Sequence, residues 1–216
     1  QTHRVLTTGG HYGYLKIAES CAKHCTYFII PSCRGRYHSV PRARLRALAA
    51  DMAPQGVKDL ILVAQETTVY GKDLYGEKSL LRRLIERCKI KGIRWIRVLY
   101  CYPEEIYPEL LASIKRNEKV CHYLDLPIQH ASDEVLRRMG RRTNQQDLVQ
   151  IITNLRQEIP DIALRTTVIC GFPGETEEQH EELMGFINEM EFDRLGAFCY
   201  SAEEGTPAAE MPDQVD

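Results

Sequence analysis

The chain has 216 residues, of which 44% are hydrophobic and 27% are charged, so it is long and apolar enough for one globular domain with a sizeable core. The formal net charge of -2 gives no overall basic field for nucleic acid. No apolar run reaches the roughly 18 residues of a membrane helix, and no signal-peptide pattern is present. Eight cysteines in a chain of this kind favour a reducing cytoplasm over a disulfide framework.

Short apolar runs with β-branched residues alternate with longer amphipathic stretches along the chain. In chain order, strands are predicted over Tyr14–Ala18, Asp59–Ala64, Trp95–Leu99, Tyr123–Leu126, Ala163–Ile169 and Arg194–Tyr200. Helices are predicted over Pro41–Gln55, Ser79–Cys88, Pro103–Lys115, Ser132–Met139 with Asn144–Glu158, and Glu175–Glu189. This repeated alternation predicts an α/β fold of parallel strands joined by right-handed crossovers, either an open doubly wound sheet or a partial barrel.

Several of the predicted strands are followed directly by unusual polar or glycine-rich segments. These segments are the loop of Cys21 and Cys25 after the first strand, Gln65-Glu66 after the second, Pro127–His130 after the fourth, and Gly171–Glu175 after the fifth. Ligands bind at the carboxyl ends of parallel strands in both candidate architectures. The segments are therefore expected to meet at one rim of the sheet and to form a binding site there.

The cysteine loop has the spacing of an iron–sulfur site. Cys21 and Cys25 begin a C-x3-C-x2-C pattern, in which three thiolates hold a [4Fe–4S] cluster. Phe28 stands where the third cysteine is expected, and its side chain has no donor atom. Zinc is the main rival metal, but a zinc site needs two further ligands, and the sequence has no second close cysteine pair.

Together with the two cysteines, further motifs resemble the radical S-adenosylmethionine (SAM) enzymes, in particular the central domain of the methylthiotransferases. The resemblance covers nearly the whole chain and rests on Gly13–Ile17, Ile30–Ser32 with Arg34-Gly35, Gly171–Thr176, and Tyr200-Ser201 with Glu203–Pro207. It implies a partial (β/α)6 barrel of the TIM type. It also implies two cofactors, a [4Fe–4S] cluster with Cys21 and Cys25 as iron ligands, and SAM, which the cluster cleaves reductively to a radical.

The resemblance further implies the residues of the SAM site. They are Tyr27, Gln65, Glu66, Gln129, Arg165, Gly171, Phe172, Gly174 and Glu175. Tyr27 is alternatively a core-filling side chain. The Gly171–Glu175 segment is expected both to make a strand-to-helix turn and to let the backbone approach a ligand closely. The sequence does not show which side chains, apart from those that bind the cofactors, take part in catalysis.

Arg165 and a separate cluster of four arginines each leave two alternatives open. Arg165 lies within a predicted strand and needs an anionic partner, which is either the SAM carboxylate or a core acid. Four further arginines cluster near the end of a predicted helix: Arg137, Arg138, Arg141 and Arg142. They are expected to be a solvated helix end, where cations suit the helix dipole, and a substrate-facing or RNA-facing patch is the alternative.

The expected substrate is a protein. Three segments resemble the methylthiotransferases that modify the β-carbon of an aspartate in a small-subunit ribosomal protein: Gln65–Gly76, Ile93–Tyr100 and Phe192–Gly196. A tRNA adenosine is the alternative substrate. The resemblance implies an electron donor such as flavodoxin or ferredoxin. It also implies that residues 1–216 are a radical SAM core domain without the family's N-terminal auxiliary-cluster domain and C-terminal substrate-binding domain.

Phe28 leaves three interpretations of the cysteine loop. The chain is an altered or erroneous copy in which the cluster is labile or absent, or Cys33 replaces the missing ligand from beyond Pro31. The third interpretation is a non-catalytic barrel, a binding or scaffold remnant that has lost its cluster.

Overall fold

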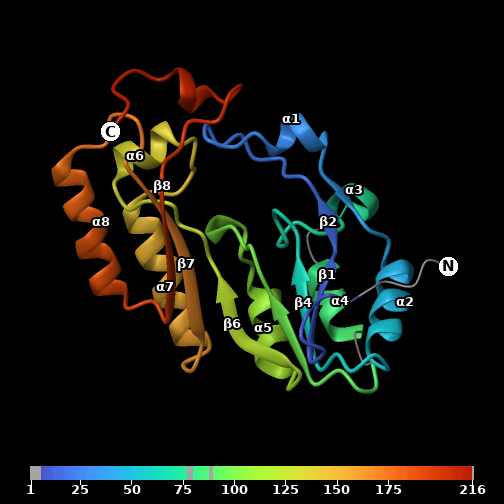
Figure 1. Ribbon diagram of the computed structural model, residues 1–216. Helices are drawn as coiled ribbons and strands as arrows, with labels where there is room; N and C mark the ends of the chain where they lie inside the picture. The colour runs from blue at the N-terminus through green and yellow to red at the C-terminus, as the bar shows by residue number, and fades with distance from the viewer. Residues whose placement is uncertain (1–5, 77–79, 88–89, 216) are drawn as a thin grey trace.

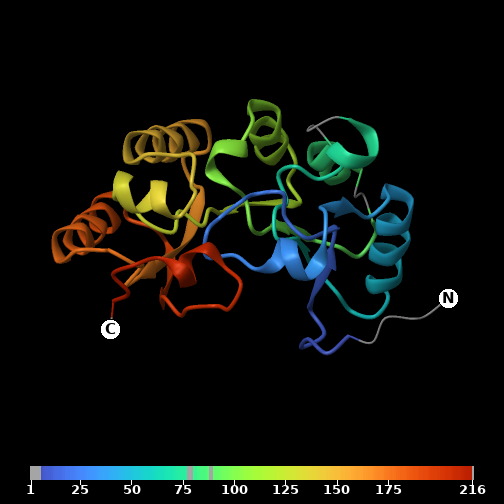
Figure 2. The same ribbon diagram turned by 90° about the horizontal axis from the view of Figure 1, so that it is seen from above.

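The computed structural model describes residues 6–76, 80–87 and 90–215, and its centre is one parallel sheet (Figure 1). Its six strands pair in the order β1 (Tyr12–Lys16), β4 (Asp59–Val63), β5 (Trp95–Val98), β6 (Val120–Asp125), β7 (Ala163–Cys170) and β8 (Arg194–Cys199). Each neighbouring pair is parallel. From above, the sheet curves into a half-barrel with most helices along its outer side (Figure 2). The predicted partial (β/α)6 barrel is therefore confirmed.

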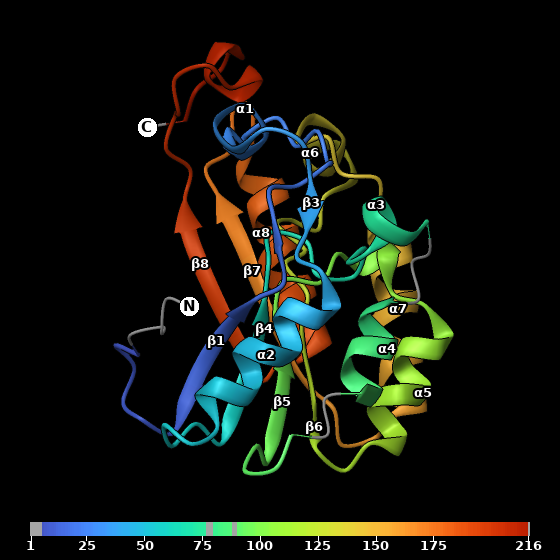
Figure 3. The ribbon, with the colours of Figure 1, turned by 90° about the vertical axis from the view of Figure 1, so that its right-hand side faces the viewer.

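Helices occupy the crossovers between consecutive strands of the sheet, and several gather on one side of it (Figure 3). They are α2 (Arg42–Met52), α4 (Leu80–Arg87), α5 (Pro108–Arg116), α6 (Asp133–Arg138), α7 (Gln145–Glu158) and α8 (Glu177–Met190). Helices α7 and α8 begin with capping boxes, in which the side chains of Asn144 and Thr176 accept backbone N–H groups. The predicted helix over 79–88 is confirmed for residues 80–87, and its two end residues lie outside the described residues.

The segment over 103–115, predicted as one helix, is divided. Pro103–Glu105 forms a short 3-10 turn, η1, and α5 begins only at Pro108. A proline disfavours the helical conformation of the residue before it, and Tyr107 is accordingly extended, with φ of -129° and ψ of 150°. The break leaves Tyr102 and η1 in the loop after β5, where Tyr102 reaches the candidate site.

Five short elements were not predicted, because two to five residues are too few to show a periodicity. They are the antiparallel pair β2 (Ala18–Glu19) and β3 (His38–Ser39), the helices α1 (Ile30–Arg34) and α3 (Lys72–Tyr75), and the 3-10 turn η2 (Pro207–Glu210). Helices α1 and α6 lie beyond the carboxyl ends of the strands in both side views (Figures 1 and 3). Segments far apart in sequence thus close over one end of the sheet.

Two hydrophobic cores support this arrangement. The main core lies between the sheet and the helices. Along β7 the side chains alternate in exposure: Leu164, Thr166 and Val168 are buried, whereas the residues between them are partly exposed. The small core near the rim consists of Val135, Met139, Phe172 and Ala208, with Tyr27, Ile169, Tyr200 and Met211 packed against it. No described helix combines the length and apolar character needed to cross a membrane.

Candidate functional site

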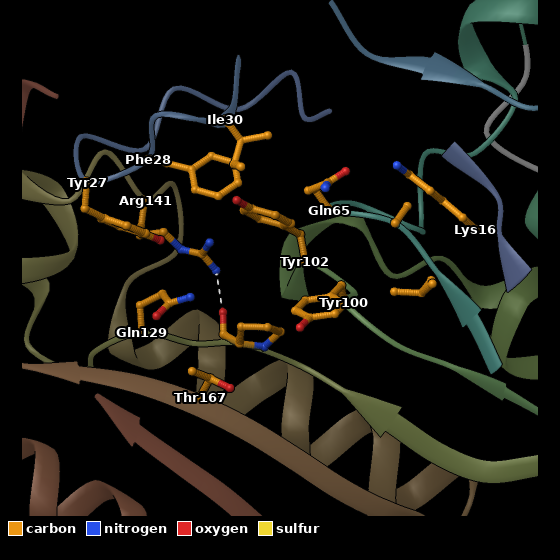
Figure 4. A pocket seen from close by; sticks show the side chains of 13 residues that line it. Lys16, Tyr27, Phe28, Ile30, Gln65, Tyr100, Tyr102, Gln129, Arg141 and Thr167 are labelled. Carbon is orange, nitrogen blue, oxygen red and sulfur yellow. Dashed lines mark hydrogen bonds between the residues drawn. The ribbon is translucent and has the colours of Figure 1, made fainter. Parts of the chain in front are cut away.

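A cavity of about 510 Å³ lies at the carboxyl ends of the strands, where the sequence predicts a binding site (Figure 4). Its volume is within the roughly 300–1,000 Å³ typical of small-molecule sites. It is lined by Lys16, Tyr27, Phe28, Ile30, Val63, Ala64, Gln65, Tyr100, Tyr102, Pro127, Gln129, Arg141 and Thr167. Of the predicted SAM-site residues, Tyr27, Gln65 and Gln129 line this cavity. The lining is mostly apolar and aromatic, with few polar groups that could orient a ligand.

Two amide oxygens in the cavity wall have no hydrogen-bond partner. They are Oε1 of Gln65 and Oε1 of Gln129, both buried and unpaired among the described residues. Gln129 also has a left-handed backbone, with φ of 71°, which is held in place because its N–H donates to Thr167 O at 2.9 Å and its carbonyl accepts from Ile169 N–H at 2.8 Å. A buried acceptor without a donor is costly. The cavity is therefore suited to a ligand that carries N–H or O–H donors.

The cysteine loop lies beside this cavity and is tied down on both sides. The N–H and hydroxyl of Thr26 donate to the carbonyls of Met139 and Arg138 at 3.0 and 2.8 Å, at the end of α6. The carbonyl of Thr26 accepts from Ala208 N–H at 2.9 Å, in η2. These bonds hold the loop between two segments that are remote in sequence.

Both cysteines of the loop are buried. Sγ of Cys21 accepts from Lys23 N–H at 3.4 Å, and Sγ of Cys25 lies 3.3 Å from the hydroxyl oxygen of Tyr102. Burial raises the pKa of the Cys21 thiol above its ordinary value, against a smaller opposite effect of the Lys23 N–H. The fold therefore favours the neutral thiol at Cys21.

Phe28 lines the cavity beside these cysteines, and no third ligand takes its place among the described residues. Across residues 6–76, 80–87 and 90–215, no three Cys, His, Asp or Glu side chains are grouped so that they could hold a metal ion. Cys33 is exposed on α1 and does not join Cys21 and Cys25 in such a group. The donor set of this chain does not fit a [4Fe–4S] cluster held by three thiolates.

Glu66 is buried next to the cavity but does not line it. One carboxylate oxygen, Oε1, accepts from the N–H of Thr68 at 3.0 Å and from its hydroxyl. The other, Oε2, is buried and has no partner among the described residues. Burial raises the pKa of Glu66 to about 7, although the Thr68 hydroxyl and Lys23 act in the opposite direction. The carboxyl group is thus poised between its neutral and charged forms near neutral pH.

Arg165 has a partner within the chain, which is one of the two alternatives that the sequence left open. Its Nη1 lies 3.5 Å from Oδ2 of Asp125, a fully buried carboxylate that also accepts from Tyr100 N–H at 3.2 Å. Burial raises the pKa of Asp125, and the Arg165 guanidinium opposes this. Arg165 does not line the cavity. The structure thus supports the pairing with a core acid, and a contact of Arg165 with SAM stays a prediction.

Arg141 corrects the expectation of a solvated arginine cluster. Arg137 and Arg142 are exposed as expected, but only 8% of the Arg141 surface is exposed. Its Nη2 donates to Pro127 O at 2.8 Å, and its guanidinium lies 4.4 Å from the ring centre of Tyr102 (Figure 4). Helix α6 ends at Arg138, and the chain turns at Gly140, with φ of 74°. Arg141 therefore points into the cavity wall.

The Gly171–Glu175 segment forms the predicted turn, but none of its side chains lines the cavity. Gly171 and Gly174 have φ of 72° and 74°, and a Cβ on Gly174 would lie 2.6 Å from Nη1 of Arg138. Phe172 is fully buried in the small core, and its ring centre lies 6.4 Å from that of Tyr27. The turn therefore acts on the cavity through Tyr27, and a direct contact with SAM stays a prediction.

The Glu175 side chain stabilises this turn by a hydrogen bond to its backbone. Its carboxylate accepts from Phe172 N–H at 2.9 Å and lies 3.2 Å from a ring nitrogen of His180 and 3.5 Å from one of His130. Burial alone would raise the pKa of Glu175, but the hydrogen bonds of His130 and Phe172 outweigh it, and the pKa is lowered. The carboxylate is thus held as an anion and used structurally.

Sequence reasoning missed several residues of the cavity wall, namely Lys16, Tyr100, Tyr102, Arg141 and Thr167. For Tyr100 and Tyr102 a signal existed, because they follow the third predicted strand and should reach the same rim as Gln65. For Arg141 the signal was Gly140, which ends the helix and redirects the chain. Lys16 and Thr167 lie within strands, so their access to the cavity depends on the curvature of the sheet.

Residues 15–187 match the family model of the radical SAM superfamily, and the chain belongs to this superfamily. It is 63% identical over 215 residues to the ribosomal protein uS12 methylthiotransferase RimO of Lachnoclostridium phytofermentans, an alignment that covers 100% of this chain and 49% of the relative. It is 53% identical over 214 residues to the RimO of Clostridium botulinum, covering 99% of this chain and 48% of the relative. The chain thus spans about half the length of these curated relatives.

Solved structures with low sequence identity share the fold. The radical SAM methyltransferase TsrM from Kitasatospora setae superposes with a TM-score of 0.74 at 19% identity, over 93% of this chain and 39% of TsrM. The coproporphyrinogen III oxidase HemN from Escherichia coli, a radical SAM enzyme, gives a TM-score of 0.64 at 20% identity, over 94% of this chain and 46% of HemN. Both similarities support the half-barrel architecture.

Proposed function

We propose that the chain is the radical SAM domain of a RimO-type methylthiotransferase, which adds a methylthio group to the β-carbon of an aspartate in ribosomal protein uS12. The observation that carries the proposal is the 63% identity along the whole chain to a protein of that name. A tRNA adenosine is the less favoured substrate. The position of the cavity, at the carboxyl ends of a curved parallel sheet, agrees with a cofactor site.

The cavity residues fit SAM better than they fit the cluster. The unpaired oxygens of Gln65 and Gln129 would accept from amino groups of the ligand, and the aromatic rings of Tyr27 and Tyr102 offer apolar walls. The buried guanidinium of Arg141 would favour a carboxylate. When bound, SAM supplies the carbon and radical chemistry of this superfamily. In the proposal, the residues of this chain bind and orient SAM.

Phe28 favours a second candidate function, a barrel that binds SAM but does not cleave it. Because the described residues offer no third thiolate beside Cys21 and Cys25, the chain as it stands lacks the ligand set of the superfamily's cluster. Cleavage of SAM in this superfamily depends on that cluster. The two candidates share the fold and the cavity, and they differ in whether iron and sulfide are retained.

Anaerobic reconstitution with iron and sulfide tests both candidates. We expect the native chain to retain far less iron than one [4Fe–4S] cluster, and the variant Phe28→Cys to retain a full cluster and to cleave SAM when dithionite is added. Cys33→Ala is the matched control and should leave iron retention unchanged, because Cys33 is exposed on α1. A full cluster in the native chain would show that Phe28 does not impair it. Failure of Phe28→Cys would show that the missing ligand lies elsewhere.

The remaining half of the relatives' length leaves room for the other parts of the proposed enzyme. We place there an N-terminal auxiliary-cluster domain and a C-terminal substrate-binding domain, and we expect a flavodoxin or ferredoxin as electron donor in the cytoplasm. The full-length protein with Phe28→Cys, assayed against uS12 and against tRNA, decides the substrate. Methylthiolation of the RNA instead of the protein would contradict the proposed substrate.

A further inference from the structure

Two free cysteines face each other across the last pair of strands. In the parallel ladder of β7 and β8, Cys170 is the direct partner of Cys199, at the carboxyl end of both strands. The N–H of Tyr200 donates to the carbonyl of Cys170 at 2.8 Å, so the two strands are still hydrogen-bonded at the position of this pair. We propose that Cys170 and Cys199 are a modification site. A small-molecule disulfide would oxidise the two thiols, and a disulfide bond would form between them.

The register of the strands provides the geometry. Neighbouring strands lie roughly 4.8 Å apart, and disulfides join residues whose Cα atoms lie about 4.4–6.8 Å apart. Side chains of directly paired residues point to the same face of a sheet, so the two thiols lie on one side. No other two described cysteines are paired across a ladder. The register therefore brings the two residues side by side on one face of the sheet.

The two thiols differ in their exposure to solvent. Cys199 is exposed, whereas Cys170 is half-buried. Burial, the Glu175 carboxylate and Cys199 itself raise the pKa of Cys170. Cys199 is therefore the thiol that meets an oxidant first, and Cys170 reacts second from its protected position.

The reaction balances with oxidised glutathione as the oxidant. The Cys199 thiolate attacks one sulfur of glutathione disulfide, forms a mixed disulfide and releases one glutathione thiol. The Cys170 thiolate then attacks Sγ of Cys199 and releases the second glutathione thiol. The two cysteines lose two electrons and two protons, which the two glutathione molecules take up.

A disulfide between Cys170 and Cys199 would also affect the small core at the rim of the sheet. Strand β8 is an edge strand, and Phe198 beside Cys199 is 61% exposed. Cys170 leads through Gly171 to Phe172, and Cys199 leads directly to Tyr200, whose ring centre lies 5.4 Å from that of Phe172. Phe172 in turn packs against Tyr27 in the cavity wall. A disulfide would therefore fasten the edge strand where it carries part of the small core.

Mass spectrometry tests the site directly, independently of the proposed enzymatic function. Cleavage after Arg165 and Arg194 places Cys170 in peptide 166–194 and Cys199 in peptide 195–216, with no other cysteine in either. After incubation of the native chain with oxidised glutathione, we expect these peptides joined, with the loss of two hydrogens. Cys170→Ser and Cys199→Ser should each abolish the joined peptide, and the matched control Cys33→Ser should retain it.

Two outcomes would overturn the proposal. One is glutathione attached to Cys199 without the joined peptide, which would show that Cys170 cannot reach it. The other is a joined peptide that contains Cys33 or any third cysteine in place of one of the pair. Deuterium exchange of amides 195–201 tests the consequence for the rim, because the disulfide should slow exchange there in the native chain and not in Cys199→Ser. Unchanged exchange in the joined form would refute the effect on the edge strand.

Discussion

Replacing Gly140 by alanine should loosen the cysteine loop from α6. Gly140 has φ of 74°, and a Cβ built on it would lie 2.7 Å from the carbonyl oxygen of His24 and 3.6 Å from Cα of Cys25. Both neighbours are backbone atoms, which cannot swing aside as a flexible side chain can. The added methyl group must therefore displace either the loop or the turn.

The expected loss of stability has two parts. A left-handed backbone costs an L-residue roughly 1–2 kcal/mol relative to glycine. Forcing extra volume into a packed site costs typically about 1–3 kcal/mol more. Gly76→Ala is the matched control, because Gly76 has φ of 73° and no described atom lies within 4 Å of its Cβ position. It should show only the first part.

Urea unfolding of the three proteins measures these parts. We expect Gly140→Ala to lose about 1–3 kcal/mol more than Gly76→Ala, which corresponds to a Tm lower by about 2–4 °C per kcal/mol for a chain of this size. The displaced loop should also expose Cys21 and Cys25 to a thiol reagent in Gly140→Ala alone. Equal losses in the two variants, with unchanged thiol reactivity, would refute the close approach of Gly140 to His24.

Two further substitutions test the buried charges of the site. Glu66 has a pKa of about 7 in the folded chain and of about 4.5 when unfolded, so the folded state binds more protons between these values, and the free energy of unfolding should fall by up to about 3 kcal/mol as the pH rises from 4.5 to 7. Glu66→Gln should flatten this dependence in urea unfolding at several pH values, and an unchanged slope would exclude Glu66 as its origin. Arg165→Met should destabilise the chain by roughly 1–3 kcal/mol, because it leaves the Asp125 carboxylate buried without its partner, whereas the control Arg194→Met on the exposed edge strand should change little. If Arg165→Met instead leaves stability unchanged and weakens SAM binding, the contact with the ligand is the correct alternative.

The site could be predicted from the sequence where a residue's role follows from its position after a strand. Gln65 and Gln129 were placed at the rim because they lie in segments that follow strands, and parallel strands end at a common rim, where both line the cavity. Arg141 was placed wrongly for the opposite reason. Its neighbours form a charged helix end, whereas the guanidinium of Arg141 itself donates to Pro127 O in the cavity wall, a contact that the sequence does not show.

Cys170 and Cys199 show the same limit for pairs of residues. Each lies in an apolar run that is typical of a buried strand, and the sequence holds no sign of their register, which depends on the length and packing of α8 between the two strands. The predicted role of Arg165 was limited in the same way. The sequence showed that it needs an acid, and only the neighbouring strand supplied Asp125.

The sequence by itself determined the alternation of parallel strands with helices and the missing third cysteine, because periodicity and ligand spacing are local properties of the chain. The choice of a partial barrel over an open sheet came from the resemblance to a family. Phe28 has no donor atom in any conformation. Only the tertiary structure decided that Cys33 stays apart from Cys21 and Cys25, that Arg141 enters the cavity, and that two strand cysteines face each other. Burial and partners depend on which distant segments meet, and this is set by the packing of the whole domain.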